Sequence, residues 1–201
     1  GTAVKDTTTG QTILAYIDPQ NRRFFSSFEA SSSQASDLPN DRTELSDIDL
    51  IDTRTLDAQS GVVVSGSFSR SAEDDSILQW YSVSDDEGTV VDPLSGSILK
   101  PGEPGYASAA ERRAALISNN TLQLTNSAIA SFSITLDSGA IYAPLVINQA
   151  SGERYFAFAA ANPDRQAHFT GFGANGWGME DVYGGGDRDY DDLVVRFSLG
   201  S

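Results

Sequence analysis

Apolar and polar side chains alternate near the end of the chain. The apolar residues of one face are Leu193, Val195, Phe197 and Leu199, and Val194, Arg196 and Ser198 fall between them. A period of two is typical of a β-strand with one buried face. The pattern therefore predicts a half-buried strand over 193–199.

Similar short runs recur through most of the sequence. Those that predict strands are 12–17, 61–69, 76–83, 89–91, 131–136, 140–147, 154–159 and 166–171. They are bounded by Gly, Asp, Asn and Ser, which are typical of tight turns. The turn residues at 85–88 predict a hairpin between 76–83 and 89–91. Many short strands between such turns predict an all-β fold, a β-sandwich of short antiparallel strands.

One segment has a helical pattern. Residues 106–117 (YASAAERRAALI) are rich in strong helix formers. The apolar residues that recur at helical spacing are Tyr106, Ala109, Ala110 and Ala114. We predict one helix near 106–117, which connects two sheet edges.

Residues 26–57 are rich in Ser and Asp and contain few large apolar residues. This composition predicts a loop-rich insert, with 31–40 as a loop. Asp47, Asp49 and Asp52 form either a second ion site or a solvated strand face, and the strand face is favoured. No clean boundary divides the sequence, so we predict a single domain over 1–201 that can bury a sizeable core.

The densest group of acidic residues surrounds three consecutive glycines, Gly184–Gly186. Its six carboxylates are Glu180, Asp181, Asp187, Asp189, Asp191 and Asp192. Carboxylates this close repel one another, and each raises the cost of ionising the next. Ca²⁺ takes about six to eight oxygen ligands and prefers carboxylates and backbone carbonyls. We therefore predict that these six residues bind Ca²⁺, in preference to forming a solvated acidic turn.

Other site types fit the sequence less well. If Asp187 opened an EF-hand loop, the closing glutamate would be replaced by Ser198. Residues 171–176 match G-x-G-x-x-G, but no helical pattern follows to hold a pyrophosphate. His168 is the only histidine and has no nucleophile motif beside it, so a surface or strand position is favoured. We predict that the chain is not an enzyme.

The overall charge excludes some classes of binding partner. The chain has 13 basic and 28 acidic residues and a formal net charge of −15. This charge repels nucleic acids and anionic membranes, so we predict no nucleic-acid partner. The absence of cysteine excludes disulfides and thiolate metal sites, and bound Ca²⁺ can supply the missing stabilisation of a secreted domain. Strong acidity is also typical of salt-adapted proteins, and composition does not separate the two.

The sequence pattern predicts no targeting or membrane-spanning segment. No run approaches the ~18 apolar residues of a membrane helix, so we predict no membrane insertion. Gly1-Thr2-Ala3 does not open a signal peptide. We expect a monomer within a longer chain.

Four side chains near the acidic group are candidates for binding a ligand. Trp177 and Tyr183 flank the acidic residues, and Asn162 and Asp164 lie in a turn that leads towards them. Amides and carboxylates hydrogen-bond hydroxyls, while an aromatic face covers the apolar side of a sugar. We predict that these four residues contact a glycan or peptide. Half-buried aromatics are common in sandwiches, so a core position stays open for either ring.

An ordered series of motifs spans 78–199. It includes residues 79–83 (QWYSV), 88–93 (GTVVDP), 100–106 (KPGEPGY), 142–145 (YAPL), 155–158 (YFAF) and 185–195 (GGDRDYDDLVV). The series resembles a calcium-binding domain family, long labelled as of unknown function, found in large secreted bacterial proteins. Many of these are RTX-type adhesins of Gram-negative and cyanobacterial cells. At Tyr190 and Asp191 the family often has Phe and Asn.

The resemblance implies a β-rich domain that needs calcium, lies near the end of a long adhesin and is displayed outside the cell. It also implies a role in attachment or biofilm formation, through a glycan or peptide on a host or neighbouring cell. The alternative is a purely structural, calcium-stabilised module of a secreted protein with no ligand of its own.

Overall fold

A computed structural model describes residues 48–56, 61–126 and 128–200, together with three strands nearer the N-terminus. The contacts divide the chain into two compact units, Gly1–Arg42 and Thr43–Ser201. In the first unit, β1 (Thr2–Lys5), β2 (Thr12–Ile17) and β3 (Arg23–Ser27) form an antiparallel sheet in that order. The predicted strand at 12–17 is confirmed. The predicted loop at 31–40 lies outside the described residues, and a single calcium-dependent domain stays a prediction.

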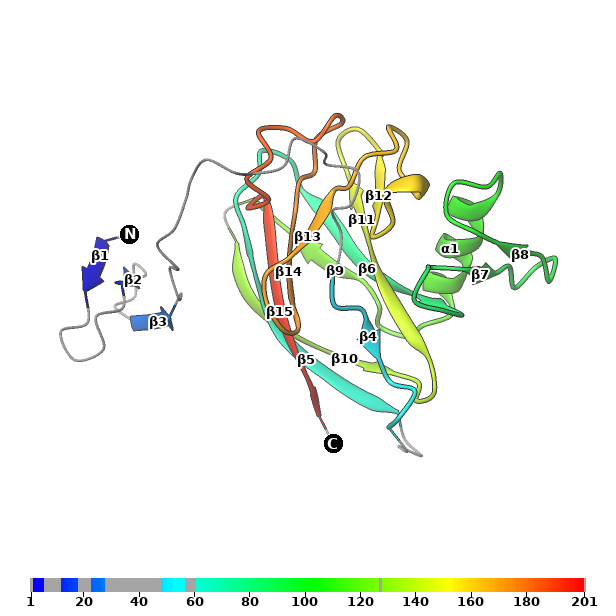
Figure 1. The fold of residues 1–201 in the computed structure, drawn as a ribbon, viewed down its shortest axis with the longest axis horizontal. Coiled ribbons are helices and arrows are strands. Elements are labelled where there is room, and N and C mark those ends of the chain that lie inside the picture. Colours follow the sequence, from blue (N-terminus) through cyan, green and yellow to red (C-terminus); the bar gives the residue numbers. More distant parts are fainter. Residues whose placement is uncertain are drawn as a thin grey trace. The chain divides into compact units, whose positions relative to one another are not determined.

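The second unit contains two larger antiparallel sheets (Figure 1). The β5 sheet has the order β10 (Ile129–Leu136), β5 (Val62–Arg70), β15 (Leu193–Gly200), β14 (Gly176–Met179) and β13 (Phe169–Gly171). The β6 sheet has the order β12 (Arg154–Phe156), β11 (Ile141–Asn148), β6 (Ser76–Val83) and β9 (Leu122–Leu124), and β4 (Ile51–Asp52) also pairs with β11. A small hairpin, β7 (Val90–Val91) and β8 (Ile98–Leu99), precedes α1 (Tyr106–Ala115), and a 3₁₀ turn, η1 (Ala159–Ala161), follows β12.

The two sheets share one apolar core. Trp80 of β6 and Phe132 of β10 are both buried, with ring centroids 5.4 Å apart. The Phe132 ring also lies over Gly66 of β5, where an added Cβ would come within 2.6 Å of it. Along β15 the predicted alternation holds, with Leu193, Val195 and Phe197 buried. The all-β, sandwich-like fold is confirmed.

The single predicted helix is confirmed as α1, which ends at Ala115. The residues predicted for its apolar face are its buried ones: Tyr106, Ala109, Ala110 and Ala114. The Tyr106 hydroxyl donates to the carbonyl of Gly88 (2.9 Å) and lies 3.1 Å from the hydroxyl of Tyr81 on β6. These contacts hold the helix against the β6 sheet.

The predicted hairpin between 76–83 and 89–91 forms no strand ladder, since β7 pairs with β8; one hydrogen bond, from Ser84 N–H to Thr89 O (2.7 Å), closes it. The turn itself is present, and the carboxylate of Asp85 accepts a hydrogen bond from Thr89 N–H (2.9 Å). Gly88 adopts φ +83° beneath the ring of Phe158, where an added Cβ would lie 2.3 Å from the ring. The turn is therefore packed against Phe158, and after it the chain leaves the β6 sheet.

Buried asparagines complete the hydrogen bonds of strand residues. Asn120 accepts from Trp80 N–H (2.8 Å) and donates to Trp80 O (2.6 Å) and to Ala114 O (2.9 Å). Its amide thus bonds a residue of β6 beyond the part of that strand that pairs with β9. The same contacts fix the end of α1 to the sheet.

Candidate metal centre

The acidic loop, residues 180–192, connects β14 to β15. The two strands are paired up to Met179 and Leu193, so the loop begins and ends at one place. Its base is further held by Glu180 N–H, which donates to His168 O (2.9 Å), and by Asp181 N–H, which donates to the carboxylate of Asp192 (3.0 Å). The ends of the loop are therefore fixed by the sheet and by its own side chains.

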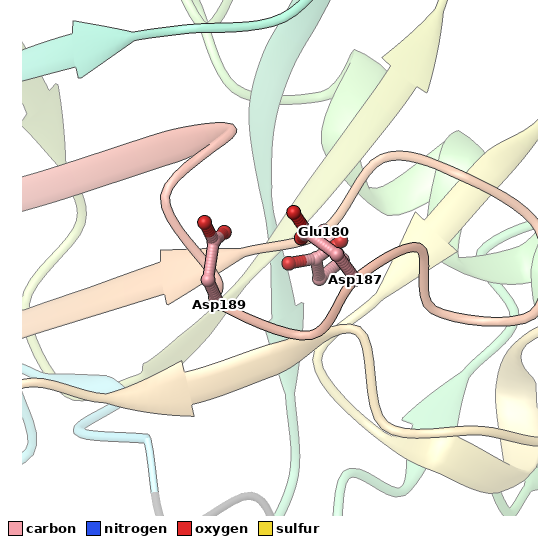
Figure 2. Close-up of side chains that lie close together, drawn as sticks. All are labelled: Glu180, Asp187 and Asp189. Carbon is pink, nitrogen blue, oxygen red and sulfur yellow. The ribbon is translucent and has the colours of Figure 1, made fainter.

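Three carboxylates of this loop converge. Carboxylate oxygens of Glu180, Asp187 and Asp189 all lie within 4.8 Å of one another. Figure 2 shows Glu180 directly after β14, with Asp187 and Asp189 on the part of the loop that returns towards β15. Glu180 is only 1% exposed, whereas the two aspartates are exposed. The cluster offers oxygen ligands from one buried and two accessible groups.

The glycines make this convergence possible. Gly184, Gly185 and Gly186 all have positive φ, in the left-handed region that glycine adopts without steric cost. At Gly186 an added Cβ would lie 2.4 Å from Oε2 of Glu180. The backbone thus passes directly against the buried carboxylate, and a side chain at this position would displace it.

The returning half of the loop is held by the same carboxylate. Tyr190 N–H donates to Oε1 of Glu180 (2.6 Å), and Asp191 N–H donates to Oδ1 of Asp189 (3.2 Å). The carbonyl of Tyr190 lies against Gly178 of β14, where an added Cβ would approach it to 2.3 Å. Glu180 therefore both contributes to the cluster and organises the backbone around it.

The electrostatics of the loop disfavour ionisation. Burial raises the pKa of Glu180, and the charges of Asp192, Asp187 and Asp189 raise it further, against the hydrogen bond from Tyr190. Burial and the neighbouring Asp189 raise the pKa of Asp191. Burial raises the pKa of Asp192 to about 6. A bound cation would favour the ionised form of all three groups.

The other three predicted metal ligands lie outside the cluster of three. Asp181 is 5% exposed and forms an ion pair with Arg70, whose side chain is completely buried. The ion pair engages Oδ2 of Asp181, and a ligand role for its other carboxylate oxygen stays a prediction. Asp192 accepts from Asp181 N–H, and Asp191 is exposed. A ligand role for Asp191 and Asp192 stays a prediction.

Arg70 was not among the residues that the sequence singled out. It continues the inward face of β5 after Val62, Val64 and Phe68, and the same Nη2 atom also donates to Asp74 O (2.6 Å) and Ser76 Oγ (2.9 Å). The alternation of buried and exposed positions along β5 places residue 70 on the buried face, so this pattern could have indicated Arg70. A buried arginine requires a buried acidic partner, and the acidic loop supplies it.

Trp177 and Asn162 are buried and the Asp164 side chain is 3% exposed, so Trp177 occupies the core position that the sequence analysis left open. Trp177 is 1% exposed and meets Phe169 edge to face, with centroids 5.2 Å apart. Asn162, 3% exposed, accepts from Phe156 N–H (2.7 Å) and donates to the carbonyls of Phe156 and Gln166. These groups satisfy core and backbone partners, so they present no free surface to a ligand.

Asp164 and His168 form a hydrogen-bonded pair beside the glycine turn, 184–186. Oδ2 of Asp164 accepts from Gly184 N–H (2.8 Å) and lies 2.9 Å from Nε2 of His168. His168 is completely buried, its Nδ1 lies 2.8 Å from Glu180 O, and its ring packs on Tyr155. Of the two expected positions for this histidine, the surface one is wrong; His168 lies directly before β13, inside the base of the acidic loop.

Tyr183 is the predicted ligand-binding residue that remains accessible. Its side chain is 58% exposed, and that of the adjacent Val182 is 52% exposed. Both belong to the acidic loop, just before its glycines. An aromatic ring and an aliphatic side chain therefore face solvent on the loop that carries the carboxylate cluster.

The family described as a domain of unknown function (DUF4114) matches residues 113–200. The matched segment contains the acidic loop and the strands from β9 to β15. No curated protein and no solved structure matches the chain. Among the described residues, no helix has the length and apolar character needed to cross a membrane.

Proposed function

We propose that this chain is a calcium-binding module of an extracellular bacterial adhesin, in which a glycan or peptide binds beside the ion. The observation that carries the proposal is the convergence of Glu180, Asp187 and Asp189 within 4.8 Å. We further propose that the module is monomeric within a longer chain and mediates attachment or biofilm formation.

The donor set fits Ca²⁺. All three side chains offer carboxylate oxygen, the ligand type that hard divalent cations prefer, and zinc sites usually need nitrogen or sulfur. A positive ion here would offset the repulsion that raises the pKa of Glu180. Glu180, Asp187 and Asp189 would hold the ion. When bound, calcium would supply positive charge and coordination positions that a ligand hydroxyl or carboxylate can fill.

The exposed part of the acidic loop supports a ligand contact. Tyr183 presents an aromatic ring that can cover the apolar face of a sugar or pack on a peptide side chain. Val182 extends the apolar surface beside it. These two residues take the place of Trp177, Asn162 and Asp164 in the proposed contact, because those three are buried or bonded within the fold.

A purely structural role for calcium is the second candidate. It is favoured by the same burial, which leaves Tyr183 as the one exposed member of the four residues expected to bind a ligand. In that case the ion would only offset the charge of the loop. The two candidates differ in whether any molecule binds in a calcium-dependent manner.

Two sets of measurements test the proposal in order. Isothermal titration of the metal-free protein with CaCl₂ should show saturable binding, and EDTA should lower the melting temperature. A glycan array and a peptide library, screened with calcium and again with EDTA, should then give binding that EDTA abolishes. Absence of calcium binding overturns the whole proposal, whereas calcium binding without any bound glycan or peptide favours the structural role.

A further inference from the structure

A concave site lies away from the acidic loop. It is a cleft of about 550 Å³. Its apolar lining residues are Ile48, Leu50, Ile141, Ala157, Phe158, Phe197 and Leu199, and its polar ones are Asp49, Asp52, Asp86 and Asn175. We call it the acidic cleft. Its volume is in the range of sites that hold small ligands or a few side chains.

The cleft lies where strands from both sheets meet. Ile141 belongs to β11 of the β6 sheet, and Phe197 and Leu199 belong to β15 of the β5 sheet. Asn175 lies in the turn between β13 and β14, at the opposite end of β14 from Glu180. The acidic cleft is therefore built independently of the proposed calcium site.

The polar lining is entirely neutral or acidic. Asp49 accepts a hydrogen bond from Asn175 N–H through Oδ2 (2.8 Å), which fixes its carboxylate at the rim. Asp52 and Asp86 both contact Arg54, at 2.7 and 3.2 Å, and the hydrogen bond from Arg54 lowers the pKa of Asp52. Arg54 itself does not line the cleft. Three carboxylates against one guanidinium leave an excess of negative charge around an apolar floor.

We propose that the acidic cleft binds a lysine or arginine side chain of a partner peptide. Such a side chain combines an aliphatic stem with a cationic end, so its stem can pack on Leu50 and Phe158 while its charge meets Asp49 and Asp86. A neutral apolar side chain would leave these carboxylates without a counter-charge. An anionic one would be repelled by them and by the net charge of −15.

The test uses a lysine peptide and an uncharged copy of it. The probe is Ac-Leu-Lys-Leu-NH₂ and the control is Ac-Leu-Nle-Leu-NH₂, each titrated into the ¹⁵N-labelled full chain in excess calcium at low salt. The lysine peptide should shift amide resonances of Phe158, Asn175 and Leu199. The norleucine peptide should bind at least about tenfold more weakly, the equivalent of ~1.4 kcal/mol. Equal affinities, or shifts confined to other residues, overturn the proposal.

Matched variants distinguish binding in the acidic cleft from nonspecific attraction by the acidic surface. Asp49→Asn with Asp86→Asn removes two charges from the rim, and Glu73→Gln with Glu87→Gln removes two exposed charges that do not line it. The first pair should weaken the lysine peptide about tenfold or more, and the second less than about twofold. Similar losses in both pairs would indicate nonspecific attraction and overturn the proposal. Failure of the parent chain to bind the lysine peptide would also overturn the proposal, for example if another segment or partner occupies the cleft.

Discussion

Arg70 and Asp181 form a buried ion pair although they are separated by 111 positions in the sequence. The arginine ends β5, and the aspartate is the second residue of the acidic loop. The pair therefore ties the loop to the end of β5, an inner strand of its sheet. It also engages one oxygen of a carboxylate that the sequence analysis assigned to calcium.

Breaking this pair should destabilise the fold strongly. In Arg70→Met, the carboxylate of Asp181 stays buried without its partner, which costs about 3–5 kcal/mol in the free energy of unfolding. Urea denaturation in excess calcium measures the loss. Arg54→Met is the control, because the Arg54–Asp52 pair is roughly half exposed and contributes little to stability. Equal losses in the two variants would contradict the assigned role of Arg70.

Calcium affinity should depend on the three converging carboxylates. Glu180→Gln, Asp187→Asn and Asp189→Asn each remove one charged ligand, and each should raise the calcium Kd by about tenfold or more. Glu73→Gln removes one charge at an exposed position outside the acidic loop and should change the Kd by less than about threefold. Isothermal titration gives the four values. Similar effects in all four variants would show that charge density, and not coordination, controls binding.

Gly186 and Gly184 provide a second pair of matched variants. Alanine is strained at both because both have positive φ, but only at Gly186 would the new Cβ lie 2.4 Å from Glu180 Oε2. Gly186→Ala should therefore weaken calcium binding by about tenfold relative to Gly184→Ala. The comparison is made by calcium titration of both variants. Equal affinities would mean that Glu180 can move without affecting the ion.

Without divalent metal, the fold should be more stable at pH 5.5 than at pH 7.5. The pKa of Asp192 rises from 3.8 to about 6 on folding, so its contribution is complete below pH ~4 and is lost as the pH rises through about 6. The raised pKa values of Glu180 and Asp191 act in the same direction. Melting temperatures in EDTA across this range measure the effect.

Asp192→Asn should flatten this pH dependence, because the variant cannot titrate at that position. The lowered pKa values of Asp52, Asp92 and Asp164 affect stability only at a more acidic pH, below the window. A metal-free melting temperature that rises from pH 5.5 to 7.5 would contradict the raised pKa values in the loop.

The two aromatic residues near the loop should respond differently to truncation. Trp177→Ala removes a fully buried side chain and should cost about 3–5 kcal/mol of stability. Tyr183→Ala removes an exposed ring and should change stability by less than about 0.5 kcal/mol. Any calcium-dependent ligand found by screening should bind Tyr183→Ala more weakly. Unaltered binding would place the contact away from this part of the loop.

The parts of the fold that could be predicted are those in which one local pattern decides the structure. Leu193, Val195 and Phe197 lie on the buried face because a period of two leaves few alternatives. The buried face of α1 follows in the same way from the spacing of Tyr106, Ala109, Ala110 and Ala114. By contrast, β14 was missed, since the sequence Gly-Trp-Gly-Met has no alternation and all four residues are buried.

The candidate site was predicted as a segment but not as a set of contacts. Six neighbouring carboxylates identify the loop. Which of them converge and which pair elsewhere depends on residues distant in sequence. Asp181 pairs with Arg70, and Asp164 holds Gly184, so tertiary packing decides which carboxylates can converge. Trp177 looked like a ligand contact because glycines surround it, but those glycines instead allow close packing around a core strand.

The side-chain amides of Asn162 and Asn120 also protect the edges of the β6 sheet. β12 is an outer strand of that sheet, and Asn162 bonds both the N–H and the carbonyl of its residue Phe156. Asn120 does the same for Trp80 where β6 extends past β9. Unpaired strand edges readily add a strand from another molecule. By occupying these positions, the two asparagines leave the β6 sheet fewer free backbone groups with which a strand of another molecule could pair.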